Sequence, residues 1–371
     1  FYRKEKFSFK ETIKSNLWDF SLICMLLWAG ISTALADDKL FALQGYWYRK
    51  DGYYTYLVYA SMYICAKAIN SEKLKLWVFR WIAVVCTCLS MMTLFQYNDK
   101  LFEMLGAHGE GLNIYTTYGG IFYNTNHFAY LLTIGILAMS CLVVVEKKYI
   151  NKIIFLALFG FNTWGLIINN TFGSYLGVLF GIIFLTIILT IKEKKNLFYM
   201  MSVIIVFIGI SICVNILNNT LLTNFQTTYS DAKTISTNDS GGSQRIGLWK
   251  YALKCIAKKP VFGYGPEGLL TPYYNAGFYN DRPHNEFIQH AAFMGIPGLI
   301  FYLTALISIF VYCIKRISKL NIYILLTGGV VFGYLVSSFF GNTMYYTTPF
   351  YFIFLGMLSA CSRKMLFLDK H

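Results

Sequence analysis

The chain carries few charged residues for its length. Asp, Glu, Lys and Arg make up 13% of its 371 residues, whereas soluble domains carry about a quarter. So few charges cannot cover the surface of a soluble protein of this size, and 56% of the residues are hydrophobic. The composition therefore excludes a soluble enzyme and a disordered chain, and it favours a polytopic membrane protein.

Acidic residues are scarcer still. The 18 Asp and Glu face 32 Lys and Arg, which gives a formal net charge of +14. Such an excess is typical of proteins that bind nucleic acid or an anionic membrane surface. Here the basic residues form short clusters between long apolar runs, so we expect membrane lipid as a partner and no nucleic acid.

Patterns that hold metals or disulfides are also missing. The nine cysteines include no CxxC pair, and eight of them lie in or beside apolar runs, where Cys acts as a small apolar residue. The sequence contains no HExxH, no Asp-x-Asp and no carboxylate cluster. We therefore expect no disulfide framework, no metal site and no cofactor.

Long apolar runs are what the sequence does have. About 20 apolar residues cross a bilayer, and ten stretches qualify: 15–36, 53–70, 76–96, 127–146, 152–169, 174–191, 197–217, 285–313, 321–339 and 343–361. We predict an all-α polytopic bundle that forms one integral membrane domain over 1–371. Lys and Arg concentrate in alternate short connections and at both ends of the chain, so both termini are predicted to be cytoplasmic.

The longest outer connection, 218–284, is predicted to carry the active site. Loops of more than about 12–15 residues are usually functional or disordered, and the second half of this one is patterned. Its apolar residues and its lysines recur with helical spacing on different faces, and a proline follows: Ile246, Trp249, Leu253 and Ile256; Lys250, Lys254 and Lys258; Pro260. This pattern predicts an amphipathic helix that lies on the membrane surface or caps the bundle.

Arg245 begins this helix on its inward side. A guanidinium beside the free amides of a first turn suits an anion. The alternative is an arginine that extends to the membrane interface or pairs with a carboxylate.

The loop ends in residues 281–286 (DRPHNE). Pro283 fits the first position of a helix, which would place His284, Asn285 and Glu286 in the outer first turn of the eighth span. His284 can exchange a proton near neutral pH, and Arg282 can hold diphosphate oxygens. The alternative for His284 is a structural cap on its own helix. Further along, residues 295–298 (GIPG) predict a kink.

The spans themselves hold almost no acid or base. Ionisable side chains occur only near span ends, at Asp19, Lys67, Arg80 and Glu146, and we expect His127 and His290 to be core histidines. Ion-coupled transporters usually need such groups deep in the bundle. This counts against a polysaccharide-pathway transporter or flippase, although that alternative stays open, as does a non-catalytic member of a polysaccharide-assembly complex.

Together these segments resemble the O-antigen ligase and polymerase family of bacterial membrane glycosyltransferases. The resemblance is carried by the order and spacing of residues 243–245 (SQR), Trp249, 259–260 (KP), 263–265 (GYG), 283–289 (PHNEFIQ) and 295–298 (GIPG). Residues 120–126 (GIFYNTN) are similar to a glycine-to-Asn-Pro-Asn stretch of that family. Family members have about twelve spans, which leaves room for more before Phe1.

The resemblance implies transfer of a glycan from undecaprenyl diphosphate to a hydroxyl acceptor, itself a glycan or lipid-linked, on the outer face of the cytoplasmic membrane. Neither metal nor nucleotide is implied. His284 matches the proposed base or acceptor-orienting histidine, and Arg245 matches an arginine taken to bind diphosphate. Asn126, Asn285 and Glu286 fall in the matching motifs as substrate-binding candidates.

Two departures from the family pattern bear on diphosphate binding. The family typically has Ser-Arg-Gly before its sixth span, whereas this chain has Thr171, Phe172 and Gly173. In addition, Asn126 follows Thr125 rather than a proline. The missing arginine makes Arg282, which has no firm counterpart in the family, a candidate replacement. Ligase and polymerase differ only in the acceptor, and the sequence leaves both open.

Overall fold

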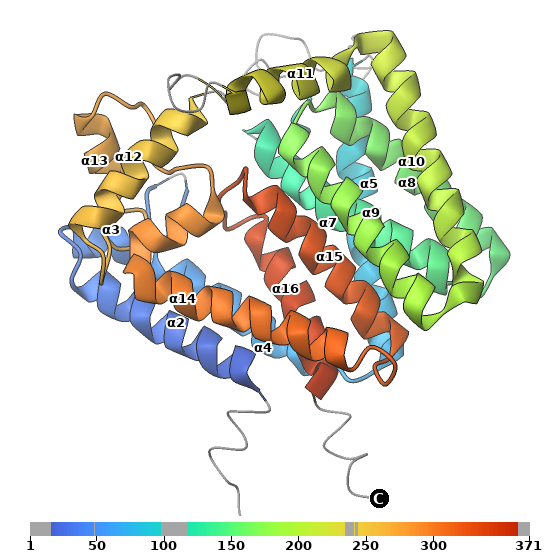
Figure 1. Cartoon of the computed structure of the whole chain (residues 1–371), viewed down its shortest axis with the longest axis horizontal. Helices are drawn as coiled ribbons and strands as arrows, with labels where there is room; N and C mark the ends of the chain where they lie inside the picture. The colour runs from blue at the N-terminus through green and yellow to red at the C-terminus, as the bar shows by residue number, and fades with distance from the viewer. Residues whose placement is uncertain are drawn as a thin grey trace, which may run out of the picture.

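A computed structural model describes residues 16–47, 49–97, 118–122, 124–233, 241 and 244–362. These residues form helices and connecting loops, with no strand among them. The main helices (Figure 1) are α2 (Leu17–Ala34), α3 (Lys39–Gln44), α4 (Tyr53–Lys67), α5 (Glu72–Tyr97), α7 (Thr125–Val145), α8 (Tyr149–Ile168), α9 (Phe172–Lys192), α10 (Leu197–Asn218), α11 (Thr220–Lys233), α12 (Arg245–Lys258), α13 (Leu270–Asn275), α14 (Glu286–Lys315), α15 (Ile322–Ser338) and α16 (Thr348–Ser359).

The predicted all-α membrane bundle is confirmed. Each of the ten predicted spans contains a helix, and seven described helices are long and apolar enough to cross a membrane. The other three predicted spans correspond to shorter helices. α15 and α16 are apolar but have 17 and 12 residues, and the tyrosine-rich α4 has 15.

α7 is the central helix, and 94% of the residues in its apolar 18-residue stretch are buried. It packs against α5, α8, α9 and α15, while α2 pairs with α14 and α4 with α16. The closest helix pair, α9 and α15, meets at small residues, as is common in membranes. A Cβ added to Gly177 would lie 2.6 Å from the carbonyl oxygen of Gly333, so a larger residue there would separate these helices.

The predicted kink in α14 is confirmed at Gly295, whose φ of 72° and ψ of 177° are not helical. Segment 260–265 inserts at this break. The amide of Ile296 donates to the Pro260 oxygen (2.8 Å), and the Trp28 Nε1 group donates to the Met294 oxygen (2.9 Å). A Cβ at Gly295 would lie 2.0 Å from the Val261 oxygen, so only glycine fits here.

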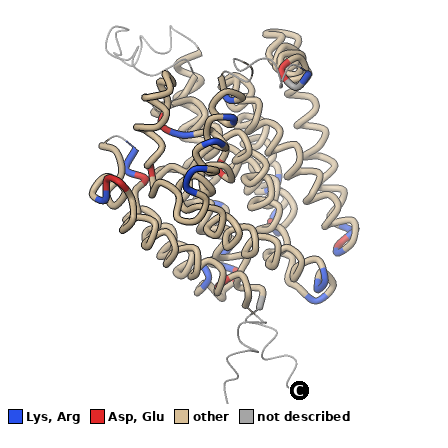
Figure 2. The backbone as a smooth tube through the Cα atoms, turned by 60° about the vertical axis from the view of Figure 1, so that its left-hand side comes forward, with Lys and Arg blue, Asp and Glu red and all other residues tan. Residues whose placement is uncertain are grey.

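The predicted amphipathic helix is confirmed as α12, which packs on α14. Its buried face differs in part from the predicted stripe. Leu253 is 56% exposed, whereas Leu248, Ala252 and Cys255 are buried. α11, α12 and α13 lie at one end of the bundle, and the first turn of α2 and the last turn of α16 lie at the other (Figure 1). Lys and Arg occur at both ends (Figure 2).

Candidate active site

α12 brings Arg245 to the first turn of α7. The Nη2 atom of Arg245 lies 3.4 Å from the Oδ1 atom of Asn126. The Asn126 side chain is held in turn by Asn124, whose Oδ1 accepts from the Nδ2 atom of Asn126 at 3.1 Å. The structure thus joins two residues predicted to bind substrate. Within the described part of the chain, the partner of Arg245 is this neutral amide.

His284 lies in the loop before α14, not in its first turn. The helix begins at Glu286, and the Asn285 side chain accepts from the amides of Phe287 and Ile288 at 3.1 Å each. Asn is among the best N-caps, so Asn285 takes the position that the sequence had suggested for His284, and Pro283 precedes the helix. The predicted placement of His284 and Asn285 in the first turn was therefore wrong.

The loop around His284 is hydrogen-bonded to α12, and the backbone of His284 has an unusual conformation. The Trp249 Nε1 group donates to the Pro283 oxygen at 2.7 Å. His284 adopts a left-handed backbone conformation with φ 52°, which is rare for a residue other than glycine. Its Nε2 atom lies 3.3 Å from the Asn280 Oδ1 atom. Strain of this kind is common at functional sites.

The charge state of His284 follows from its surroundings. Burial lowers the pKa of His284, the Arg245 charge lowers it further, and the opposing effect of Asp281 still leaves it at about 3. The imidazole is therefore neutral at physiological pH, and one ring nitrogen is available as a proton acceptor.

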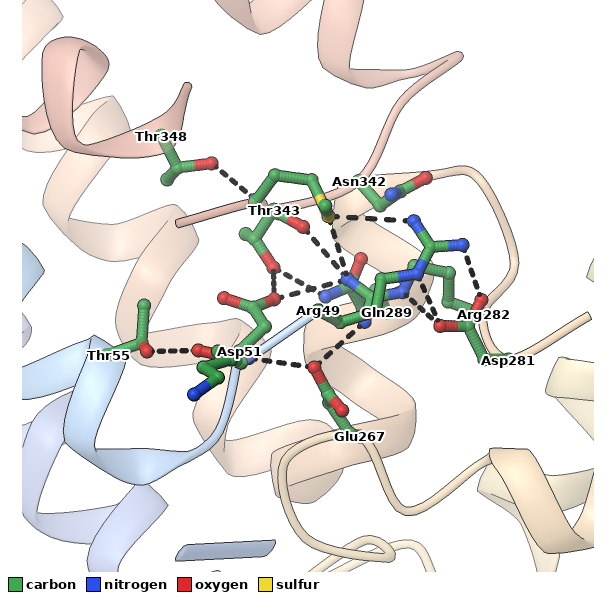
Figure 3. Close-up of polar contacts among 12 residues, drawn as sticks. Arg49, Asp51, Thr55, Glu267, Asp281, Arg282, Gln289, Asn342, Thr343 and Thr348 are labelled. Atoms are coloured by element: carbon green, nitrogen blue, oxygen red, sulfur yellow. Dashed lines mark hydrogen bonds and ion pairs between the residues drawn. The ribbon is translucent and has the colours of Figure 1, made fainter. Parts of the chain in front are cut away.

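Arg282 is not exposed, contrary to the prediction that it lies at the outer face of the membrane. Its side chain is fully buried, and its three nitrogens contact Asp51 (3.2 Å), Glu267 (3.1 Å) and Asp281 (3.2 Å). It also donates to the Thr343 oxygen at 2.9 Å (Figure 3). Because every nitrogen of the guanidinium meets a protein acceptor, Arg282 can reach a diphosphate only by breaking buried ion pairs.

A second arginine that the sequence did not single out completes this cluster. The Nε and Nη2 atoms of Arg49 contact the Asp281 carboxylate at 2.8 and 3.1 Å. The amide of Asp51 donates to Glu267 at 2.8 Å, and the Tyr59 hydroxyl donates to Asp51 at 2.7 Å. The two arginines and three acids thus tie the loop before α4 to the two loops that flank α13 (Figure 3). We call Arg49, Asp51, Glu267, Asp281 and Arg282 the buried ion cluster.

The pKa values of the three acids in the buried ion cluster are not all shifted in the same direction. Burial raises the pKa of Asp51 and of Glu267, and the Arg282 charge opposes it in both. Burial also acts on Asp281, but there the charges of Arg282 and Arg49 outweigh it and lower the pKa.

Among the described residues, no group of three or more His, Cys, Asp or Glu could hold a metal ion.

Glu286, also predicted to bind substrate, points into the bundle. It is buried, its Oε1 accepts from the Tyr302 hydroxyl at 2.8 Å, and it lies 3.6 Å from the Nε2 atom of His290. The Tyr302 hydroxyl in turn lies 3.0 Å from that of Tyr351. α14 therefore carries a buried acid and a histidine, and the expectation that ionisable residues occur only near span ends was incomplete.

His127 lies beside Asn126 and is buried, as expected of a core histidine. Its Nδ1 atom lies 2.5 Å from the Tyr346 hydroxyl, and its Nε2 atom lies 3.5 Å from the Asn342 side chain. The connection between α15 and α16 therefore reaches the first turn of α7. At the position where the resemblance implies an arginine, the Phe172 ring stacks on Tyr175 with centroids 6.2 Å apart, so this corner is uncharged.

Comparison with known proteins assigns part of this region. Residues 153–303 match the family model described as O-antigen ligase. The match runs from α8 into α14 and includes Arg245, Trp249 and His284, whereas Asn126 and Arg49 lie outside it. No curated protein matches the chain.

Proposed function

We propose that the protein is a membrane glycosyltransferase, because residues 153–303 match the family model described as O-antigen ligase. It moves a glycan from undecaprenyl diphosphate to a hydroxyl of a glycan or lipid-linked acceptor on the outer face of the bacterial cytoplasmic membrane. The observation that carries this proposal is the contact between Arg245 and Asn126 at the start of α7, together with the Arg245 charge that lowers the pKa of His284.

The reaction follows from the chemistry of these groups. The acceptor oxygen bonds to the anomeric carbon of the donor, and the bond from that carbon to the diphosphate breaks. The acceptor proton passes to His284, and undecaprenyl diphosphate leaves. The energy is held in the glycosyl–diphosphate bond, so neither a nucleotide nor ATP is consumed.

Arg245 is the cation for the diphosphate. Its fork matches phosphate oxygens, and the first-turn amides of α12 add their partial positive charge. Its contact with Asn126 is long and neutral, so the guanidinium gives up little when it turns to an anion. Asn126 positions Arg245.

His284 is the general base. A neutral imidazole accepts the acceptor proton as the new bond forms. The charge of Arg245 is one cause of its low pKa, and a diphosphate bound to Arg245 would offset that charge. Donor binding therefore raises the basicity of His284 when the base is needed.

Arg282 and Asn285 are positioning residues in this mechanism. The buried ion cluster fixes the segment that precedes His284, and Asn285 fixes the start of the helix that follows it. Glu286 supports the same helix start from inside the bundle through Tyr302.

The test uses purified protein in proteoliposomes with the lipid-linked glycan as the donor. Wild type should lengthen or transfer the glycan, His284→Ala and Arg245→Gln should lose at least 100-fold in rate, and Lys254→Gln, on the exposed side of α12, should keep it. Full activity of both site variants would overturn the proposal.

A transporter of lipid-linked glycan is the second candidate, because α14 carries the buried pair Glu286 and His290, of the kind that ion-coupled transporters use. A transporter would move the lipid-linked glycan across the bilayer without changing its covalent length. It would also lose activity in Glu286→Gln and keep it in His284→Ala, whereas a transferase that uses His284 as its base would lose activity in His284→Ala.

A further inference from the structure

A polar pocket of about 640 Å³ opens at the outer end of α8 and α10. The described residues of its wall come from the last residue of α5, the loop before α7, the first residue of α7, the ends of α8 and α10, and the first residue of α11. The residues that matter here are Tyr97, Tyr118, Thr125, Asn169, Asn170 and Asn218. We call it the α8–α10 pocket.

The lining of the α8–α10 pocket is polar but uncharged. None of the described residues that line it is acidic or basic, so this part of the wall offers no cation to a phosphate and no anion to a cation. Two aromatic rings, Tyr97 and Tyr118, lie with centroids 5.8 Å apart, and Trp164 packs on Tyr97 at 5.6 Å. Amides beside aromatic rings suit a ligand that is neutral, rich in hydroxyls and apolar on its ring faces.

Some side-chain amides of this pocket are hydrogen-bonded within the protein, and others are not. Asn169 donates to the carbonyl oxygens of Tyr118 (3.0 Å) and Thr125 (3.1 Å), and Asn224 donates to the Oδ1 atom of Asn170 at 2.7 Å. In the described part of the chain, the Asn218 side chain and the Nδ2 atom of Asn170 make no such bond. Donors therefore remain for a ligand.

The backbone around the pocket is strained. Two lining residues, Tyr118 and Asn170, have φ values of 62° and 63°, in the left-handed region that residues other than glycine seldom adopt, Asn more readily than Tyr. The Asn169 bonds to Tyr118 and Thr125 fix these loops. These contacts indicate that the shape of the pocket is held in place.

The pocket adjoins the candidate active site through the first turn of α7. Thr125 lines the pocket, and the next residue, Asn126, contacts Arg245. α11 leads from the same end of α10 towards α12 (Figure 1). A short oligosaccharide can therefore occupy the pocket while its reacting end lies near Arg245 and His284.

We propose that the α8–α10 pocket binds a neutral sugar residue of the glycan substrate. The inference rests on the proposed function and adds to it a carbohydrate subsite away from the diphosphate. The sugar belongs to the donor glycan or to the acceptor glycan, and the recognition chemistry is the same for both.

The test compares KM with kcat for donor and acceptor in the reconstituted transfer assay. Asn218→Ala removes an exposed amide and should raise KM for one of the two glycans about two- to tenfold with kcat unchanged, the effect of one hydrogen bond. Tyr97→Ala should act on the same KM, and Tyr97→Phe should restore it because the ring is kept. Asn151→Ala, at the opposite end of α8, is the matched control.

A direct binding measurement tests the proposed sugar subsite without relying on the transfer reaction. Titration with the lipid-free repeat oligosaccharide should change the fluorescence of Trp164, and this change should be absent in Trp164→Phe and weakened in Asn218→Ala. If Asn218→Ala and Tyr97→Ala leave both KM values and the titration unchanged while His284→Ala abolishes transfer, the subsite is overturned and the proposed function stands. If wild type transfers no glycan, the proposed function fails, and the titration alone then decides the subsite.

Discussion

Replacement of Arg282 distinguishes a structural role from a substrate-binding one. In Arg282→Gln, three carboxylates within 3.2 Å lose their shared guanidinium, and only Arg49 remains beside Asp281. Removing one partner of a buried ion pair costs about 3–5 kcal/mol, because the remaining charge is left buried without compensation. We therefore expect the variant to be destabilised by about that amount.

Arg282→Lys should fall between wild type and Arg282→Gln. An ammonium keeps the positive charge but cannot extend a planar fork to three acceptors. The pair Arg282→Gln and Asp51→Asn should be less destabilised than the sum of the single variants, because the second change removes a carboxylate that the first leaves unpaired. Arg316→Gln, which removes an arginine that lies over the Tyr312 ring 4.3 Å from its centroid, is the control and should change stability little.

The measurements are thermal unfolding of the purified protein and its transfer rate well below the melting temperature. Arg282→Gln should melt earlier and keep part of its activity in the folded fraction. A variant that melts like wild type but no longer binds the donor would refute this reasoning and return Arg282 to the diphosphate-binding role that the sequence suggested.

Three further outcomes test other parts of the structure. Transfer should show no loss of kcat/KM as pH falls through 6.5, because the pKa of His284 is lowered to about 3 and the base stays neutral. In Arg245→Gln the acid limb of the residual activity should move to higher pH; an unchanged limb near pH 6.5 in both proteins would contradict the assignment. Gly295→Ala should lower the melting temperature strongly, since its Cβ would meet the Val261 oxygen at 2.0 Å. Asn285→Ala should cost about 1 kcal/mol as a lost N-cap, measured by the same melt; no change would argue that α14 starts elsewhere.

Most of the helices could be predicted from patterns within single segments of the sequence. The ten apolar runs all contain helices, and the helical spacing after residue 244 predicted α12. These predictions succeed because hydrophobic periodicity and helix-ending residues are properties of a single segment. The start of α14 was missed for a local reason as well: Pro283 suits a first helical position, but the Asn285 side chain can bond two amides and fixes the helix start three residues later.

Contacts between residues far apart in sequence could not be predicted. Arg49, Asp51, Glu267 and Asp281 each look like ordinary polar loop residues, and only the folded chain brings them around Arg282. The contact between Arg245 and Asn126 joins residues 119 positions apart, and no spacing rule predicts it. The family resemblance had named both residues as substrate-binding candidates, without indicating that they touch.

The central claim is that the protein breaks the glycosyl–diphosphate bond of its donor. The most direct test follows proteoliposomes that contain purified protein, lipid-linked glycan and acceptor but no nucleotide sugar, and counts the undecaprenyl diphosphate released and the glycosidic bonds formed. We expect one molecule released for each new bond with wild type, and neither product with His284→Ala. Passage of unaltered lipid-linked glycan across the bilayer, with no undecaprenyl diphosphate released, would contradict the claim.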